Sequence, residues 1–504
     1  MWRDNSHYEP VGNKHRYPMP PSVALILWFI LLLVLLCFDP AKAPKTSGAL
    51  WVPVVWMFII GSRLPSQWLG GAVGQAAQAL EEGNPLDRAI YFILILLASC
   101  VLKSRSFSWG DFFARNVALM AFISFALLSV CWSDFPFVAF KRWFRDLGSY
   151  LVVLVVLSDP RPLEAVRTVL RRLSYLLVPL SIVLIKYFPE ISKQYDSWTG
   201  VATYAGATTS KNMLGAACLV SGLFFFWDML TRWPQRKQQR TKRIILVNVA
   251  LLGMTLWLLH LANSATSGVC LLLGCLIVAA THSKALQRRL GILKGLIPIS
   301  FCLYVVLAFG FNLNGDLAGA VGRDPTLTDR TKIWQILLRM HTNPLIGTGY
   351  QSFWLGSRLQ WFWQNSGLGQ INEAHNGYLQ VYLNLGLIGV LLLAGFLIAG
   401  YRNICSRLRT ESGLTVLALS VWAVLVFYNM TEAAFEGGVL WLMLLMGVVV
   451  LPQRSTTRVR NAPAFCSAET LTQPFLEATG VRTDSALRTL GNFPPSAMRE
   501  VRNS

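Results

Sequence analysis

The stretch IILVNVALLGMTLWLLHLANSATSGVCLLLGCLIVAATHS, residues 244–283, contains no Asp, Glu, Lys or Arg. A helix needs about 20 apolar residues to cross the hydrocarbon core of a bilayer. The stretch is therefore long enough for two spanning helices. The small polar residues from Asn263 to Thr266 lie near its middle and predict a tight turn between them.

The rest of the chain repeats this pattern. Of its 504 residues, 54% are hydrophobic and 14% are charged, and the mean hydropathy is +0.47. A soluble domain carries about 25% charged residues. Further charge-free blocks cover residues 22–38, 295–315, 374–401, 413–431 and 437–453. They show no alternation of period two, so they predict helices rather than strands.

The predicted fold is an all-α integral membrane protein with about 12 to 13 spanning helices. The expected centres lie near Leu31, Met57, Leu94, Ala121, Val152, Leu180, Ala217, Leu251, Leu273, Leu303, Ile388, Val421 and Leu442. The helix around Val152 is expected to be the shortest and either half-buried or re-entrant. The parity of the count, and with it the side of the N-terminus, stays open.

Basic residues gather in four connections, at residues 231–243, 282–294, 401–409 and from 454 onward. Short cytoplasmic loops are enriched in Lys and Arg, so we place these four in the cytoplasm. The connections between them then face outside: residues 189–210, 263–266, 312–374 and 430–437. The net charge of +20 reflects this topology. Because the basic residues are spread among loops, nucleic acid is not an expected partner.

We divide the chain into three parts: a polar N-terminal segment, residues 1–21; a membrane domain, residues 22–453; and a disordered cytoplasmic tail, residues 454–504. Residues 312–374 form a large outside loop, which is too long for a mere connector and is expected to contain short helices. The nine cysteines lie mostly inside helices and show no metal-ligand spacing. They therefore predict neither a zinc site nor a disulfide framework, and we expect no metal and no cofactor.

A polar cluster, Asn372 to Asn376, runs directly into a predicted membrane helix. Asn372 is the expected N-cap, and Glu373 suits the positive end of the helix. His375, with an ordinary pKa near 6.5, suits proton transfer near neutral pH. A histidine that only caps the helix at the membrane surface is the alternative.

Arg330 lies in TLTDRTKIWQILL, residues 326–338. Ile333, Trp334, Leu337 and Leu338 are spaced as the apolar face of a short amphipathic helix on the membrane surface. A guanidinium matches the oxygens of a phosphate, so Arg330 is a candidate phosphate ligand. A solvated or snorkelling arginine is the alternative.

Three further outside segments carry candidate residues. WSDFPFVAFKRWFRD, residues 132–146, holds Arg142 and Arg145 among aromatic side chains, against the usual inside bias of positive charge. Lys211 opens a membrane helix, where it can add charge to an anion site or snorkel. Glu432 lies in a short turn near the membrane, where it either orients a positive group or is a solvated carboxylate. Such a set of groups suits a lipid-linked pyrophosphate.

These segments resemble the O-antigen ligase and O-antigen polymerase superfamily, and within it the bacterial exopolysaccharide polymerisation proteins. The resemblance rests mainly on NPLIGTGYQSFW, residues 343–354, and EAHNGYLQVYLNLGLIG, residues 373–389. TLTDRTKIW, SKNMLG, WSDFP and NMTE support it. Together these segments extend from Trp132 to Glu432.

The resemblance implies a multi-pass glycosyltransferase of the GT-C type in the bacterial inner membrane, working without a metal. Its donor would be a glycan on undecaprenyl pyrophosphate, and its other partners a glycan acceptor, the lipid bilayer, a chain-length regulator and export proteins. His375 resembles the histidine proposed as general base. Arg330 resembles the arginine that binds pyrophosphate, and Arg142, Arg145 and Lys211 are further matches.

Glu373, Asn376, Trp334 and Glu432 are expected to support these residues. One departure is Ala265, which stands where relatives often carry a basic residue. Polymerisation of lipid-linked repeat units is the function that the resemblance favours. A ligase that transfers the glycan to lipid A core, a transporter of lipid-linked oligosaccharide and a non-enzymatic assembly partner are the alternatives.

Overall fold

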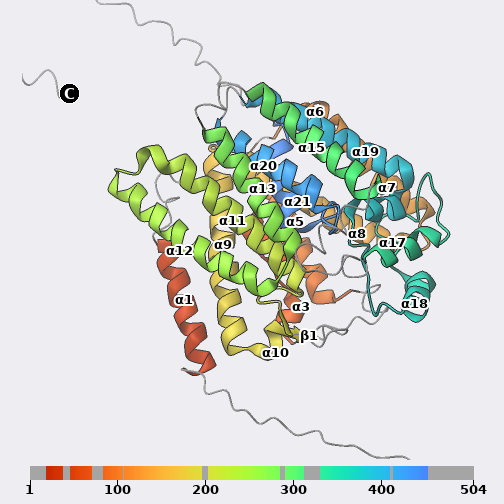
Figure 1. Cartoon of the computed structure of the whole chain (residues 1–504), viewed down its shortest axis with the longest axis horizontal. Helices are drawn as coiled ribbons and strands as arrows, with labels where there is room; N and C mark the ends of the chain where they lie inside the picture. Colours follow the sequence, from red (N-terminus) through yellow and green to blue (C-terminus); the bar gives the residue numbers. More distant parts are fainter. Residues whose placement is uncertain are drawn as a thin grey trace, which may run out of the picture. The chain divides into compact units, whose positions relative to one another are not determined.

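The structure is a computed structural model that describes residues 19–37, 46–70, 83–105, 107–195, 202–283, 290–310, 330–408 and 412–451. Most of the predicted N-terminal segment, the first part of the large loop and the predicted tail lie outside these residues. The described part is helical (Figure 1), apart from one antiparallel pair of short strands, β1 (Lys193–Tyr195) and β2 (Ala202–Tyr204).

The helices in chain order are α1 (Pro21–Cys37), α2 (Trp51–Gly61), α3 (Pro65–Trp68), α5 (Pro85–Ser104), α6 (Trp109–Arg115), α7 (Val117–Leu128), α8 (Pro136–Leu157), α9 (Pro162–Tyr187), α10 (Pro189–Ser192), α11 (Lys211–Arg232), α12 (Gln239–Ala262), α13 (Ala265–His282), α15 (Leu290–Gly310), α17 (Arg330–Arg339), α18 (Gly356–Asn365), α19 (Gly377–Arg407), α20 (Ser412–Tyr428) and α21 (Gly438–Val448). Every predicted centre lies on its own helix.

Among the described residues, six helices are long and apolar enough to cross a membrane: α5, α9, α11, α12, α13 and α19. A seventh is added if α6 and α7, which meet at a bend of 96°, count as one span. Five other apolar helices are shorter. The chain is thus an all-α, multi-pass membrane protein. The expectation that the helix around Val152 is the shortest is wrong, because α8 has 22 residues whereas α2 and α21 have 11 each.

The bundle has an apolar outside as well as an apolar core. Leu219, Phe224 and Phe225 of α11 are fully buried, and α11 packs against α9, α12, α13 and α21. On the outer helices, Leu246, Val269 and Ile299 expose more than half of their surfaces. Exposed apolar residues over several helices are typical of a surface that faces lipid.

The charge-free stretch of residues 244–283 folds as predicted. It forms most of α12 and all of α13, and these helices are joined by a turn at Asn263 and Ser264. Asn263 has φ 49°, the left-handed conformation that ends many helices and that Asn tolerates.

The motif NPLIGTG packs into a break in α19. Gly386 has φ 65°, and the backbone N–H groups of Leu387 and Ile388 donate to the carbonyls of Pro344 (2.9 Å) and Leu345 (3.1 Å). The loop therefore satisfies the backbone groups that the break exposes at membrane depth. A Cβ on Gly386 would lie 2.2 Å from the carbonyl carbon of Leu345, so only glycine allows this approach.

The large loop has a small core of its own. Ile333 and Leu337 of α17 pack with Leu359 and Phe362 of α18 and with Leu383 of α19. Figure 1 shows α17 and α18 beside one another, next to the start of α19. Of the predicted apolar face of α17, Ile333 and Leu337 are buried, whereas Leu338 is exposed.

Segments predicted to lie outside meet on one face of the bundle. The side chains of Thr266 and Thr431 form a hydrogen bond of 2.9 Å, which joins the α12–α13 turn to the turn before α21. The backbone N–H of Gly377 donates to the carbonyl of Asn429 at 2.8 Å, which joins the start of α19 to the same turn. The sequence therefore grouped these connections correctly, and the side of the membrane stays a prediction.

Candidate functional site

Backbone geometry fixes His375 at the entrance to α19. His375 has φ 47°, and the next residue, Asn376, is the N-cap, because its side chain accepts a hydrogen bond from the N–H of Leu379. The prediction of Asn372 as N-cap is therefore wrong by four residues. A Cβ on Gly377 would lie 2.0 Å from Asn429 Oδ1. This close approach brings Glu432 next to His375.

Four side chains, Arg330, Glu373, His375 and Glu432, form what we name the His375 cluster. His375 Nδ1 lies 2.9 Å from Glu373 Oε1 and 3.5 Å from Glu432 Oε2. Within the described residues Nδ1 meets no acceptor with the geometry of a hydrogen bond, so we describe these two contacts as ion pairs. Arg330 lies 2.5 Å from Glu432 Oε1. Two carboxylates and two cations balance one another.

Neighbouring side chains hold this cluster in place. Asn212, at the start of α11, donates to Glu432 Oε2 at 3.3 Å. Trp334 Nε1 donates to the carbonyl of Ala374 at 2.9 Å, and Asn376 Nδ2 donates to the carbonyl of Met430 at 3.3 Å. Glu432 is buried, so the prediction of a solvated carboxylate is wrong, and its interaction with positive groups is confirmed.

The carboxylates change the protonation of His375. Burial of the ring lowers its pKa, but Glu373 and Glu432 outweigh this effect and raise the pKa to about 10. Burial also raises the pKa of Glu373, whereas His375 and Arg330 bring it below its usual value. His375 is therefore a cation at neutral pH in this arrangement, and Glu373, with 43% of its side chain exposed, is the accessible unprotonated group.

The cluster also offers ligand atoms to a metal ion. One atom each from Glu373, His375 and Glu432 lie within 4.8 Å of one another. A divalent ion would have to replace the positive charge that Arg330 and protonated His375 already supply. The charge balance therefore favours a site without metal, as the sequence predicts, and this stays a prediction.

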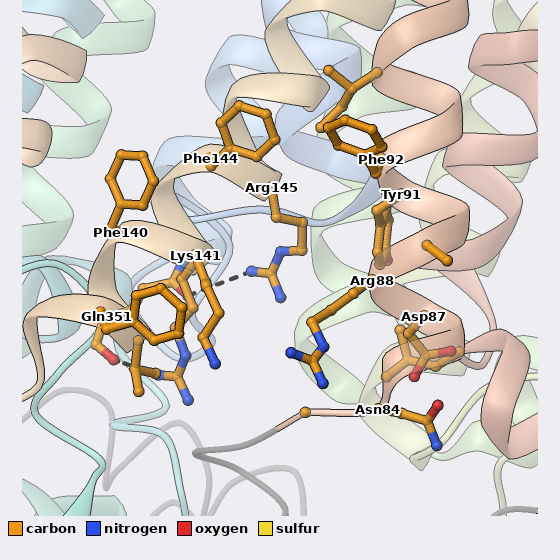
Figure 2. A pocket seen from close by; sticks show the side chains of 17 residues that line it. Asn84, Asp87, Arg88, Tyr91, Phe92, Phe140, Lys141, Phe144, Arg145 and Gln351 are labelled. Atoms are coloured by element: carbon orange, nitrogen blue, oxygen red, sulfur yellow. Dashed lines mark hydrogen bonds between the residues drawn. The ribbon is translucent and has the colours of Figure 1, made fainter.

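A second feature is a basic cavity of about 690 Å³ between α5 and α8. Its cations are Arg88, Lys141, Arg142 and Arg145. Figure 2 shows Arg88 of α5 opposite Lys141 and Arg145 of α8, with the rings of Phe92, Phe140 and Phe144 on one side of these charges. The nearby carboxylate of Asp87 accepts two hydrogen bonds from Ser66, one from the backbone N–H at 2.9 Å and one from the hydroxyl at 2.6 Å. The cavity is thus positive at one side and apolar at the other.

Contacts with the large loop orient the arginines of α8. Arg142 donates to the carbonyl of Gln351, and Arg145 NH2 lies 3.4 Å from Gln351 Oε1. Arg145 also contacts Asp146 at 2.8 Å. Gln351 is itself held by Asp146, to which its Nε2 donates at 2.7 Å.

A second cavity, of about 740 Å³, adjoins the His375 cluster and is lined by Glu373 and Glu432. A smaller one of about 380 Å³ shares Arg145 and Gln351 with the basic cavity, and Glu373 and Asn372 with the 740 Å³ cavity. It therefore lies next to both, and we name it the connecting cavity. Glu436, which also lines it, has a pKa raised to about 7, mainly by burial.

The structure thus separates the predicted pyrophosphate ligands. Arg142 and Arg145 line the basic cavity, Arg330 is paired with Glu432, and Lys211 is not among the lining residues of the three cavities. Sequence reasoning missed Arg88 and Gln351. Arg88 had one signal, a basic residue at the start of a spanning helix. Gln351 had only its place in the motif NPLIGTGYQSFW, because its contacts depend on where the loop folds.

Comparisons with known proteins bear on the same segments. Residues 249–394, from α12 to α19, match the family model described as O-antigen ligase. The chain is 26% identical over 306 residues to the exopolysaccharide production protein ExoQ of Rhizobium meliloti, which covers 59% of this chain and 67% of that protein. The matched family segment includes Arg330, Glu373 and His375. These findings confirm the resemblance to the O-antigen ligase and polymerase superfamily.

Proposed function

We propose that this chain, a multi-pass membrane protein similar to O-antigen ligases and to an exopolysaccharide production protein, joins glycan repeat units carried on undecaprenyl pyrophosphate. The reaction would take place at the periplasmic face of the bacterial inner membrane. The observation that carries the proposal is that Arg145 of the basic cavity and Glu373 of the His375 cluster line one and the same cavity, that of 380 Å³. An anion site is thereby joined to a proton-accepting site.

The basic cavity suits the donor. Arg88, Arg142 and Arg145 supply guanidinium groups, which pair with phosphate oxygens, and the aromatic rings beside them offer an apolar surface for the start of the lipid chain. Arg145 lines both this cavity and the connecting one, so it is the arginine best placed beside the reacting bond.

The proposed reaction is an inverting displacement. The oxygen of an acceptor hydroxyl forms a bond to the anomeric carbon of the donor sugar while the bond from that carbon to the pyrophosphate oxygen breaks. The pyrophosphate leaves with the electron pair and is stabilised by the arginines. The hydroxyl proton passes to Glu373, since a carboxylate base serves in inverting glycosyl chemistry.

In this scheme His375 acts as the cationic half of a pair with Glu373. It holds the carboxylate of Glu373 in place until Glu373 takes the proton and becomes a neutral carboxyl group. Arg330 fixes Glu432, which in turn keeps His375 protonated. No metal takes part in these steps.

Cells that lack this gene test the proposal when they are complemented with the wild type or His375→Asn at matched protein levels. Asn tolerates positive φ, so the variant keeps the local backbone. His260→Asn is the matched control, because His260 lies on α12 with its surface exposed. We expect single repeat units to stay on the lipid carrier only in the His375→Asn cells.

Size fractionation of the surface polysaccharide and of the lipid-linked intermediates separates the candidates. The match to a family described as O-antigen ligase makes a ligase the second candidate. Long polymer that never reaches lipid A in the variant cells would favour the ligase. Normal polysaccharide in the His375→Asn cells would refute both and favour transport or assembly.

A further inference from the structure

We infer that the 740 Å³ cavity is the binding site for the acceptor glycan, separate from the basic cavity that takes the lipid-linked pyrophosphate. This inference rests on the proposed function and specifies its second substrate site. The cavity is lined by the ends of α2 and α20, the starts of α11 and α21, α3 and β1. Its volume is within the range of pockets that enclose a small ligand, so it can take the end of a glycan chain.

The two cavities differ in charge. The described residues that line the 740 Å³ cavity include no Lys, Arg or His, whereas those of the 690 Å³ cavity include four basic residues. Glu373 and Glu432 are balanced by His375 and Arg330, so the larger cavity offers no excess of positive charge to a pyrophosphate. A neutral ligand with many hydroxyl groups is compatible with these carboxylates, because hydroxyls donate hydrogen bonds to them.

Amide and hydroxyl side chains supply the remaining polar surface: Gln67, Gln194, Thr209, Ser210, Asn212 and Asn372. Two of the amides are held by one end. Gln67 Oε1 accepts from the N–H of Leu64 at 3.0 Å, and Gln194 Nε2 donates to the carbonyl of Thr209 at 2.8 Å. Across the described part of the chain, the other ends, Gln67 Nε2 and Gln194 Oε1, form no hydrogen bond.

These free ends provide one donor and one acceptor, both on side chains that are already oriented. A sugar hydroxyl both donates and accepts, so this pairing suits a carbohydrate. Side chains fixed before binding lose little entropy when the ligand arrives. Gln67 lies in α3 and Gln194 in β1. Both residues are therefore outside the segment that matches the family model, residues 249–394.

Glu373 links the cavity to the reaction. It lines both the 740 Å³ cavity and the connecting one, whereas Arg145 lines the connecting cavity from the side of the donor. A glycan end in the 740 Å³ cavity would therefore present its hydroxyl to Glu373, opposite the leaving pyrophosphate. That arrangement is what an inverting displacement requires.

Two tryptophan substitutions separate the sites in the purified full-length protein in lipid nanodiscs. Ala216→Trp fills the 740 Å³ cavity, and Ala89→Trp fills the 690 Å³ cavity. The probes are undecaprenyl pyrophosphate without sugar and short lipid-free oligosaccharides released by partial hydrolysis of the cell's own polysaccharide. Binding is measured for both probes with the wild type and both variants.

We expect Ala216→Trp to weaken oligosaccharide binding at least tenfold with undecaprenyl pyrophosphate binding unchanged, and Ala89→Trp to do the reverse. Each variant is then shown to be folded by the probe that it retains. Gln194→Leu, which removes only the oriented amide, should weaken oligosaccharide binding alone. In the wild type, saturating undecaprenyl pyrophosphate should not displace the oligosaccharide.

Mutual displacement of the two probes, or loss of undecaprenyl pyrophosphate binding in Gln194→Leu, would overturn the separate acceptor site. So would a wild-type protein that binds undecaprenyl pyrophosphate but not the oligosaccharides. Failure of the proposed function has a different signature, because the wild type would then bind neither probe and gene deletion would leave the polysaccharide unchanged.

Discussion

Two groups of charged residues lie at opposite ends of the helices, and they differ in whether a cavity reaches them. The His375 cluster lies where α19 begins. The second group, which we name the Asp228 cluster, lies where α11 ends and α9 begins, and consists of Glu164, Arg167, Arg171, Asp228, Arg232 and Asn248.

The Asp228 cluster is closed. The side chains of Asp228 and Arg171 have no exposed surface, and Arg232 contacts Asp228 at 2.9 Å. None of its residues lines the three cavities described above. At its edge Glu164 exposes 28% of its side chain. In the His375 cluster, Glu373 exposes 43% and lines two of the cavities. Both clusters contain buried, paired charges. Only the His375 cluster can be reached from one of these cavities, so it is the candidate for catalysis.

The largest expected effect is on the reaction rate. His375→Asn should lower turnover of lipid-linked repeat units by about 100- to 10,000-fold, the usual contribution of a group that assists proton transfer. The unfolding midpoint should fall less than in Asp228→Asn, because His375 and Glu373 keep part of their surfaces exposed. Purified His260→Asn provides the comparison, and turnover near the wild-type value in His375→Asn would remove the distinction between the clusters.

Asp228→Asn should act on stability instead. The change keeps the shape of the side chain but leaves three arginines facing a single remaining carboxylate, Glu164. Removing one partner of a buried pair costs about 3–5 kcal/mol. We expect low protein yield and a lower unfolding midpoint. If the variant is as stable as the wild type but inactive, the Asp228 cluster is a second functional site.

The pH dependence of turnover sharpens the role of His375. Its pKa is about 10, raised above the ordinary value near 6.5, so the stability from its ion pairs is complete below about 6.5 and is lost as pH rises through about 10. With His375 acting as a cation, turnover should be nearly flat from about pH 7 to 9 and fall towards 10.

Glu432→Gln removes one of the two carboxylates that stabilise the imidazolium, so the fall in turnover should move to lower pH. A rate that instead rises tenfold per pH unit between about 7 and 10 would mean that neutral His375 is the base.

The smallest expected effect is that of a chelator. Because Arg330 and His375 already balance Glu373 and Glu432, treatment of the purified protein with EDTA should leave turnover unchanged. A loss that is restored by one divalent ion would show that the three ligand atoms of the cluster hold a metal.

The two motifs that carry the family resemblance turn out to do different work. EAHN places Glu373 and His375 in the candidate site, as expected. NPLIGTG instead fills the break at Gly386, and a Cβ on Gly347 would lie 2.5 Å from the backbone of Asn384. Close packing explains the glycines of this motif. The sequence alone cannot distinguish a residue needed for packing from one needed for catalysis, because either role requires one particular residue type.

The sequence by itself determined the membrane class, the helix centres and the grouping of the loops on one face. These properties depend on local hydrophobicity and charge, since each helix satisfies its own backbone in the bilayer. Only the tertiary structure decided that Glu432 meets His375, that Arg88 faces Arg145, and that Lys211 is not among the residues that line these cavities. Such contacts join segments far apart in the chain, and no spacing along one helix or loop encodes how the bundle brings them together.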